Sequence, residues 1–331
     1  MIRVGIVGAG KIVEDAHLPV LLTIPSVQVA WVTDQSNARR DLLSRMYRVP
    51  AVTPAQALQK IADIDVCLLA VPLGARAAYF DRCVECGTAV YAEKPFARTS
   101  AEHQVLQQKM PAYKLAIGFQ RRAYQCASTL RAVIASGLLG RLRSIRLTEA
   151  NFTLIGGGAS SFRTSASAAG GGITIESSIH SLDLMQHLTA AASVRTDNVQ
   201  AIVRDGIDFH VECQSHLEFS DGSEIPVELL LSRLRSLPDA FHFQFETGTV
   251  AYPVKPQLPV LLRSNMVGAS WQSLTPNEFA ATGASSINAA FGLFWQYFLD
   301  GLQNRQPGLT SACSSLLTSR WIEQIYQLMQ R

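Results

Sequence analysis

The first 119 residues alternate short apolar runs with amphipathic helical patterns, and this alternation restricts the fold more than any other feature of the chain. The first run, Ile2–Val7, is almost wholly apolar, which is typical of a strand in a parallel sheet that helices cover on both faces. Further strands are expected at residues 27–33, 65–71, 89–92 and 114–119. Helices are expected up to about residue 23 and at 38–47, 54–61, 75–86 and 100–109. We therefore predict a doubly wound α/β domain over residues 1–119.

Beyond residue 119 the pattern changes to strands that are joined by turn signals, and a second domain is expected over 120–331. Its strands are expected at 142–152, 199–203, 209–219, 224–231, 241–246 and 249–254. Its helices are expected at 127–136, 176–189, 287–302 and 310–330. The pair Asp221-Gly222 predicts a hairpin turn. The Gly/Ser/Ala-rich stretch 156–172 cannot bury a core and predicts a mobile surface loop.

Composition excludes several classes of partner. The 29 basic and 26 acidic residues are spread without long runs, so no polybasic face for nucleic acid or lipid is expected. No apolar run reaches the roughly 18–20 residues that span a bilayer, and the first residues lack a secretory pattern. The six cysteines are scattered, and the pair Cys83 and Cys86 lacks the second half of a zinc set. The sequence predicts a reduced, cytoplasmic protein without a metal, whose partner is a small molecule.

A glycine fingerprint, Gly8-Ala9-Gly10, stands directly between the first strand and the first helix. In this context Gly8 permits a tight turn, and Gly10 lets the backbone approach a pyrophosphate. The start of the following helix favours a bound phosphate. Val13 stands where a third small residue is usual, a position that governs helix packing rather than phosphate contact. The pattern predicts a dinucleotide site.

Asp34 ends the second strand, where a carboxylate can accept hydrogen bonds from the ribose hydroxyls of adenosine. This acid favours NAD, because a 2′-phosphate would meet a like charge. Arg39 and Arg40 follow closely and keep NADP open as the alternative. A purely structural role for Asp34 is capping of the next helix, a role that Ser36 could equally take.

Lys94 lies in Glu93-Lys94-Pro95, at the carboxyl end of a predicted sheet strand. Open α/β sheets bind ligands along this edge. A lysine there can donate to a hydroxyl or carbonyl oxygen and stabilise the alkoxide that develops during hydride transfer. The position therefore makes Lys94 a candidate catalytic residue, although most lysines are merely solvated.

These motifs together resemble the Gfo/Idh/MocA oxidoreductases, and the match runs nearly end to end. The residues that carry the resemblance are Gly8-Ala9-Gly10-Lys11-Ile12, His17-Leu18-Pro19, Asp34, Val71-Pro72, Gly87-Thr88-Ala89-Val90, Glu93-Lys94-Pro95, Gly118-Phe119-Gln120-Arg121-Arg122, Gly170-Gly171-Gly172 and Ile179-His180 with Asp183. The resemblance implies a Rossmann domain followed by an α+β domain with an open, mainly antiparallel sheet that binds substrate and forms oligomers. It also implies hydride transfer between NAD(P) and a sugar, nucleotide sugar or cyclitol.

The resemblance further implies that Lys94 and His180 flank the reacting carbon, with the histidine as proton acceptor or donor. Imidazole suits this task because it exchanges protons near neutral pH. A buried helix histidine is the structural alternative, and His187 lies on nearly the same helix face. Glu176 stands where the family usually has an aspartate that contacts substrate hydroxyls, and it shares a face with His180 at i, i+4.

The other implied site residues divide into two groups. Those expected to contact cofactor, besides the glycines, Asp34 and Lys94, are Lys11, Ile12, Val71, Pro72 and Glu93. Those expected to contact substrate are Gln120, Arg121, Arg163 and Asp183. For Arg121 and Arg122 an interdomain ion pair is an equal alternative, and Arg76 stands where a histidine is frequent.

Two further functions remain open from sequence. In one, the bound dinucleotide oxidises substrate only transiently, and the enzyme is a redox-neutral lyase or glycosidase. In the other, the departure at Glu176 marks a cofactor-binding homologue without catalysis. The strands of the second domain leave a broad face that helices do not obviously cover, so we expect a homodimer or homotetramer.

Overall fold

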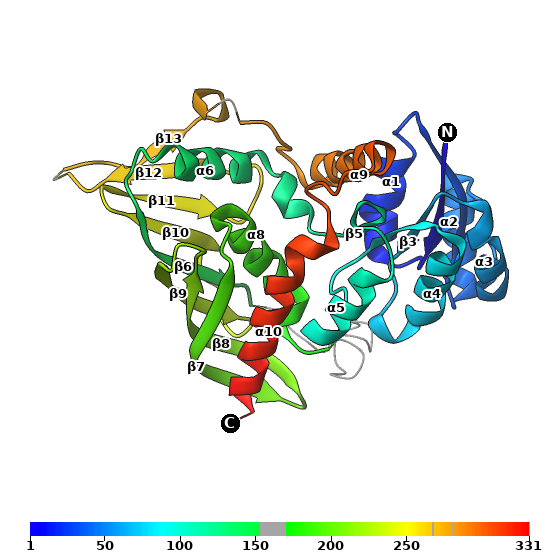
Figure 1. The fold of residues 1–331 in the computed structure, drawn as a ribbon, viewed down its shortest axis with the longest axis horizontal. Coiled ribbons are helices and arrows are strands. Elements are labelled where there is room, and N and C mark those ends of the chain that lie inside the picture. The colour runs from blue at the N-terminus through cyan, green and yellow to red at the C-terminus, as the bar shows by residue number, and fades with distance from the viewer. Residues whose placement is uncertain (153–169, 267, 280, 331) are drawn as a thin grey trace. The chain divides into compact units, whose positions relative to one another are not determined.

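A computed structural model describes residues 1–152, 170–266, 268–279 and 281–330 of the chain, which forms two compact units (Figure 1). Unit 1 comprises Met1–Gln120 and Ile287–Ser315, and unit 2 comprises Arg121–Ser286 and Leu316–Arg331. The division near residue 120 lies where the sequence pattern changes. The segment Ile287–Ser315, however, belongs to unit 1 rather than to the domain expected over 120–331.

Unit 1 is built on a parallel sheet with the strand order β2-β1-β3-β4-β5. Its strands are β1 (Ile2–Val7), β2 (Val27–Thr33), β3 (Val66–Leu69), β4 (Ala89–Ala92) and β5 (Leu115–Ile117). Strands β3 and β4 are buried along their whole length, as the unbroken apolar runs predict. The doubly wound parallel sheet is therefore confirmed.

A rudimentary sixth strand extends this sheet beyond β2. Ala51 pairs in parallel with Val32, and the amide of Val32 donates to the carbonyl of Pro50 at 2.9 Å. With this bridge counted as the third strand, the order becomes 3-2-1-4-5-6, which is the order of the Rossmann fold. The sequence did not predict this strand, because one bridged residue leaves no alternating pattern.

The helices of unit 1 begin and end at signals that the sequence carries. They are a π-helical turn, η1 (Val13–His17), followed by α1 (Leu18–Leu21), α2 (Asn37–Tyr47), α3 (Pro54–Lys60), α4 (Ala77–Cys86), α5 (Ser100–Gln108) and α9 (Ile287–Asn304). Thr53 caps α3 in a capping box with Gln56, and the side chain of Thr99 caps α5. Gly87, with φ at +69°, ends α4.

Helix α9 joins unit 1 because it carries a row of aromatic side chains that pack on the sheet. Trp295 stacks on Tyr91 of β4, with ring centroids 4.3 Å apart and planes 19° apart. Phe294 and Phe298 meet the same tyrosine edge to face. After α9, the carbonyl of Thr310 accepts from the amide of Ile117 at 3.1 Å. The apolar pattern of α9 predicted a buried helix, but periodicity does not say which core buries it.

Unit 2 contains a sheet with the strand order β13-β12-β11-β10-β6-β9-β8-β7, in which only β6 and β9 pair in parallel. Its strands are β6 (Leu142–Ala150), β7 (Ser193–Arg204), β8 (Ile207–Glu218), β9 (Glu224–Ser232), β10 (Ala240–Phe245), β11 (Gly248–Pro253), β12 (Val260–Ser264) and β13 (Gln272–Leu274). The mainly antiparallel sheet is confirmed, with Gly222 in the predicted hairpin turn at φ +82°. Strands β12 and β13 lay outside the prediction.

One face of this sheet is buried by helices. Along β10, Phe241, Phe243 and Phe245 are buried, while the alternate residues are partly exposed. The helices are α6 (Gln125–Ser136), α8 (Ile179–Thr189), which follows a second π-helical turn η6 (Thr174–Ser178), and α10 (Leu316–Met329). Helix α10 packs against both β7 and α8, and α6 packs against α8 (Figure 1).

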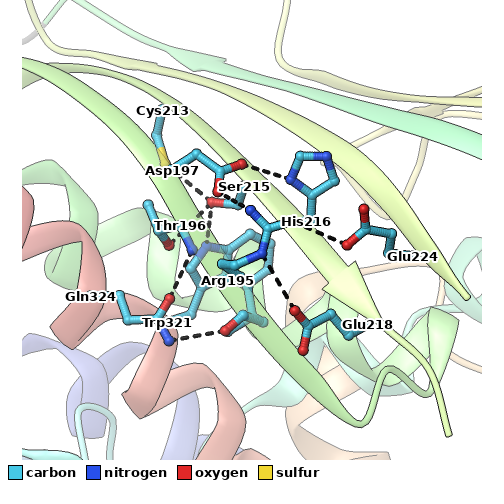
Figure 2. A network of polar contacts seen from close by, with 11 residues as sticks. Arg195, Thr196, Asp197, Cys213, Ser215, His216, Glu218, Glu224, Trp321 and Gln324 are labelled. Carbon is cyan, nitrogen blue, oxygen red and sulfur yellow. Dashed lines mark hydrogen bonds and ion pairs between the residues drawn. The ribbon is translucent and has the colours of Figure 1, made fainter. Parts of the chain in front are cut away.

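Polar contacts hold α10 in register with β7 and β8 (Figure 2). The indole of Trp321 donates to Ser215 Oγ at 3.1 Å. The side chain of Gln324 donates to the carbonyl of Val194 at 2.9 Å and accepts from the amide of Thr196 at 3.0 Å. These bonds explain why the chain beyond residue 315 returns to unit 2. Among the described residues, no helix is both long and apolar enough to cross a membrane.

Candidate functional site

The cofactor residues predicted in unit 1 gather along one edge of the parallel sheet. Each follows the carboxyl end of a strand, and the backbone ladder continues into these segments. The amide of Gly8 donates to Thr33 at 2.8 Å, that of Ala70 to Val7 at 2.8 Å, and that of Glu93 to Leu69 at 2.9 Å. Segments from four strands thus lie side by side where open α/β sheets bind ligands.

The two glycines of the fingerprint meet different constraints. Gly8 has φ at +109°, and a Cβ there would lie 2.4 Å from the carbonyl oxygen of Ala70. Around Gly10, by contrast, a Cβ would meet nothing within 4 Å. Gly8 is therefore required by the fold, whereas the bare backbone at Gly10 leaves room for another molecule. The π-helical turn that follows is a rare conformation that is frequent at functional sites.

Asp34 braces the glycine loop. Its carboxylate accepts from the amide of Ala9 at 2.7 Å and from that of Ser36 at 2.8 Å. The cap of α2 is Ser36, whose hydroxyl accepts from the amide of Arg39, so Asp34 is not the capping residue. The guanidinium of Arg39 donates to the carbonyl of Ala9, and that of Arg40 donates to the carbonyl of Asp34. Both arginines are thus used within unit 1.

Lys11 and Ile12 lie exposed beside this loop. The ammonium of Lys11 donates to Asp15 at 2.5 Å, and this hydrogen bond raises the lysine pKa. Ile12 exposes 39% of its surface. Both side chains are therefore accessible to a molecule bound over the glycines.

Glu93 lies at one end of a buried chain of hydrogen bonds through His17 to Trp295. Its carboxylate lies 2.8 Å from Nε2 of His17, and the indole of Trp295 donates to Nδ1 of His17 at 3.0 Å. Because an indole N–H only donates, Nδ1 is the acceptor, and Nε2 carries the hydrogen that it donates to Glu93. A Cβ at position 118 would lie 2.6 Å from the same carboxylate, so Gly118 leaves it space.

Lys94 is half-buried between Glu93 and Pro95, and the Lys94–Pro95 peptide bond is cis. The guanidinium of Arg76 contacts both the segment after β3 and the segment after β4. It donates to the carbonyls of Val71 and Pro95, and burial lowers its pKa to about 10. Val71 and Pro72 lie in the segment between β3 and α4.

In unit 2, Asp208 anchors the backbone that follows the glycines. Its carboxylate accepts from the amides of Gly172 and Thr174 and from the hydroxyl of Tyr326. A Cβ at Gly171 would lie 2.1 Å from that hydroxyl, and one at Gly172 would lie 2.0 Å from the carbonyl oxygen of Asp208. These contacts fix the start of η6 and therefore of the helix that carries the candidate histidine.

Glu176 and His180 lie on this fixed segment. Glu176 is in η6, and its carboxylate forms an ion pair with Arg233, directly after β9. His180 is in the first turn of α8 and is 8% exposed. His187 is a poor proton acceptor near neutral pH, because burial, and secondly Arg122 and Arg131, lower its pKa to about 3.

Asp183 is buried as the partner of Arg122. The two side chains form a bidentate pair at 2.8 and 2.5 Å, and Asp183 is 1% exposed. Burial raises the pKa of Asp183, and Arg122 opposes this shift. The sequence predicted a substrate contact here, whereas both carboxylate oxygens bind arginine, within unit 2 and not across the domains.

The remaining substrate candidates are placed as follows. Arg121 donates to Ser181 at 2.8 Å, and Ser181 in turn donates to Glu149 at 2.7 Å. Gln120 is 9% exposed, and among the described residues no group donates to its buried Oε1. Arg163 lies outside the described residues.

Sequence reasoning missed Trp295, Asp208 and Arg233. Each acts on a residue far away in the chain, such as Trp295 on His17 across 278 positions, and none carries a local motif. For Asp208 alone, the glycine at position 172 is a sequence signal, because a Cβ there would collide with Asp208.

Comparisons with known proteins identify the family and the fold. The model described as "Oxidoreductase family, NAD-binding Rossmann fold" matches residues 2–118, and the GFO/IDH/MocA C-terminal domain matches residues 127–251. An inositol 2-dehydrogenase of Acidothermus cellulolyticus is 25% identical over 260 residues, which are 76% of this chain and 72% of that protein. The rhizopine catabolism protein MocA of Rhizobium meliloti is 28% identical over 69% of this chain and 70% of its own length.

Solved structures share the fold at lower identity. The aldose-aldose oxidoreductase from Caulobacter crescentus superposes with a TM-score of 0.82 at 16% identity, over 99% of this chain and 97% of that one. Levoglucosan dehydrogenase in complex with NADH and levoglucosan gives the same TM-score, identity and coverage. Since family models cover both the parallel sheet with its glycine loop and most of the second domain, the chain belongs to the Gfo/Idh/MocA family of oxidoreductases.

Proposed function

We propose that this protein is an NAD(P)-dependent dehydrogenase or reductase that acts on a hydroxyl or keto carbon of a sugar, nucleotide sugar or cyclitol. The observation that carries the proposal is the single edge of the unit 1 sheet at which the glycine loop, Asp34 and Lys94 lie. Relatives that act on inositol or bind levoglucosan support the substrate class.

The residues of unit 1 fit a dinucleotide. The open backbone at Gly10 would take the pyrophosphate, and the free lone pairs of Asp34 would accept from the adenosine ribose. NAD is favoured over NADP because the guanidinium groups of Arg39 and Arg40 already donate within the unit. Lys11, Ile12, Val71, Pro72 and Glu93 would flank the bound molecule. When bound, the nicotinamide supplies the hydride acceptor or donor.

Lys94 and His180 would perform the proton and charge chemistry. The Lys94 ammonium donates a hydrogen bond to the substrate oxygen and stabilises negative charge as it develops. His180 takes the hydroxyl proton during oxidation and returns it during reduction. Glu176, held by Arg233, accepts from a neighbouring hydroxyl. Gln120, Arg121 and Arg163 are the further substrate contacts that we propose.

The test is a panel of sugars, nucleotide sugars and cyclitols with NAD⁺ or NADP⁺, followed at the absorbance of the reduced nicotinamide. Lys94→Met is expected to lower kcat/KM about 10²–10³-fold, and His180→Gln about 10²–10⁴-fold. Lys109→Met and His187→Gln are the matched controls and should retain activity. Tight NAD binding without turnover of any substrate would contradict the proposal. Product formation with solvent deuterium uptake and no net NADH would instead identify a redox-neutral enzyme.

We also propose a homodimer or homotetramer, formed through the sheet face of unit 2 opposite α8 and α10. Arg146 and Glu228 form an ion pair on this face, at 2.6 Å, among other polar side chains. Light scattering at micromolar protein concentration measures the mass in solution, and the mass of a monomer would contradict this proposal.

A further inference from the structure

A single buried arginine links two segments of the predicted cofactor edge. Arg76 stands directly before α4 and is 7% exposed. Its Nε donates to the carbonyl of Val71 at 2.8 Å, and its Nη1 donates to the carbonyl of Pro95. The guanidinium therefore joins the segment after β3 to the segment after β4.

Burying this guanidinium costs desolvation free energy, and two nearby carboxylates offset part of that cost. Desolvation lowers the pKa of Arg76 to about 10, and the carboxylates of Glu93 and Glu102 oppose that shift. A buried charge persists where hydrogen bonds and opposite charges compensate it. The planar fork of arginine holds two acceptors at a fixed separation, which a lysine ammonium does not. The arrangement therefore fixes a distance between two carbonyls.

Lys94 lies between the two residues that are held. On one side, the amide of Glu93 donates to Leu69 at 2.9 Å, and its carboxylate accepts from His17 at 2.8 Å. On the other side, the carbonyl of Pro95 accepts from Arg76. The backbone of Lys94 is thus anchored at both neighbours.

We propose that Arg76 is a positioning residue for Lys94. It sets the spacing between Lys94 and the Val71–Pro72 segment, against which the bound nicotinamide would lie. This inference rests on the proposed function, in which the Lys94 ammonium meets the substrate oxygen. A displacement of about 1 Å at a reacting group can lower the rate about 10²-fold.

The first experiment compares Arg76→Lys and Arg76→Met in the full-length chain, with Arg82→Met, a partly exposed arginine on α4 that pairs with Glu85, as control. Arg76→Lys keeps the charge but loses the two-point link, so kcat should fall about tenfold or more. Its NAD dissociation constant should stay within about threefold of wild type, while its thermal midpoint should fall modestly, because one buried hydrogen bond is lost. Arg76→Met should lose kcat further. Unchanged kcat in folded, NAD-saturated Arg76→Lys would overturn the inference.

The second experiment does not need turnover. Acetic anhydride labels lysines, and mass spectrometry compares Lys94 with Lys109, an internal reference that is paired with Asp81. NAD⁺ should protect Lys94 about tenfold in the wild type but less than about threefold in Arg76→Lys. Protection that is equal in both proteins would refute the role of Arg76 alone. An absence of protection in the wild type, together with silence across the substrate panel, would refute the proposed function itself.

Discussion

The indole of Trp295 donates to Nδ1 of His17 at 3.0 Å, and this bond decides which nitrogen of the imidazole faces Glu93. Trp295→Phe should keep part of the stacking on Tyr91 but leave a buried acceptor on His17 without its donor. The free energy of unfolding is expected to fall by about 1–3 kcal/mol. Urea unfolding measures it, and Trp271→Phe, a change at an exposed indole, should have little effect. Equal losses in both variants would show that the hydrogen bond contributes nothing.

Alanine substitution at the two fingerprint glycines should affect different properties. Gly8→Ala is expected to destabilise the fold, because φ is +109° and the Cβ would meet the Ala70 carbonyl at 2.4 Å. Gly10→Ala should fold normally but bind NAD at least about tenfold more weakly, since the methyl group occupies the approach of the pyrophosphate. Thermal melting and NAD titration separate the two effects. Normal NAD affinity in Gly10→Ala would exclude this loop as the phosphate site.

Asp183→Asn tests whether this acid serves structure or substrate. The substitution leaves the buried charge of Arg122 without its carboxylate, so stability should fall by about 3–5 kcal/mol. Denaturant unfolding and KM are measured on the same preparation. A stable variant with a raised KM would support the substrate contact that the sequence predicts.

Glu176 and Arg233 should be energetically coupled. In a double-mutant cycle of Glu176→Gln and Arg233→Met, we expect a coupling of about 1.5–3 kcal/mol in unfolding free energy, as for a hydrogen bond between charged groups in a largely buried place. The exposed pair Arg235 and Glu212 is the matched control, and its coupling should be smaller. Additive effects at Glu176 and Arg233 would mean that the arginine does not hold the acid.

Stability should decline as pH falls below about 6.5, the ordinary histidine pKa. His103 donates to the carbonyl of Ala312, and burial lowers its pKa to about 4. Between these values the unfolded chain binds a proton that the folded chain does not, so acid favours unfolding by about 1.4 kcal/mol per pH unit. The free energy of unfolding, measured by denaturant at several pH values from 7 to 4, should therefore depend less steeply on pH in His103→Gln. An identical slope would mean that His103 titrates normally in the fold.

The parts of this molecule that follow from local pattern could be predicted from sequence. The strand Ala89–Ala92 and the cap before α2 rest on neighbours in the chain, and the glycine loop needs only the strand before it. The partners of site residues could not be predicted in this way. Arg233 reaches Glu176 across 57 positions, and the proximity exists only once β9 is paired in the sheet.

The membership of α9 in unit 1 has a consequence for synthesis of the protein. Trp295 covers Tyr91 and completes the bonding of His17, yet it is translated after every strand of the unit 2 sheet. A nascent chain that ends before α9 exposes that aromatic surface to water, which favours association with chaperones or other chains. The nucleotide-binding unit, although its strands are translated first, thus completes its core only after every strand of unit 2 has been made.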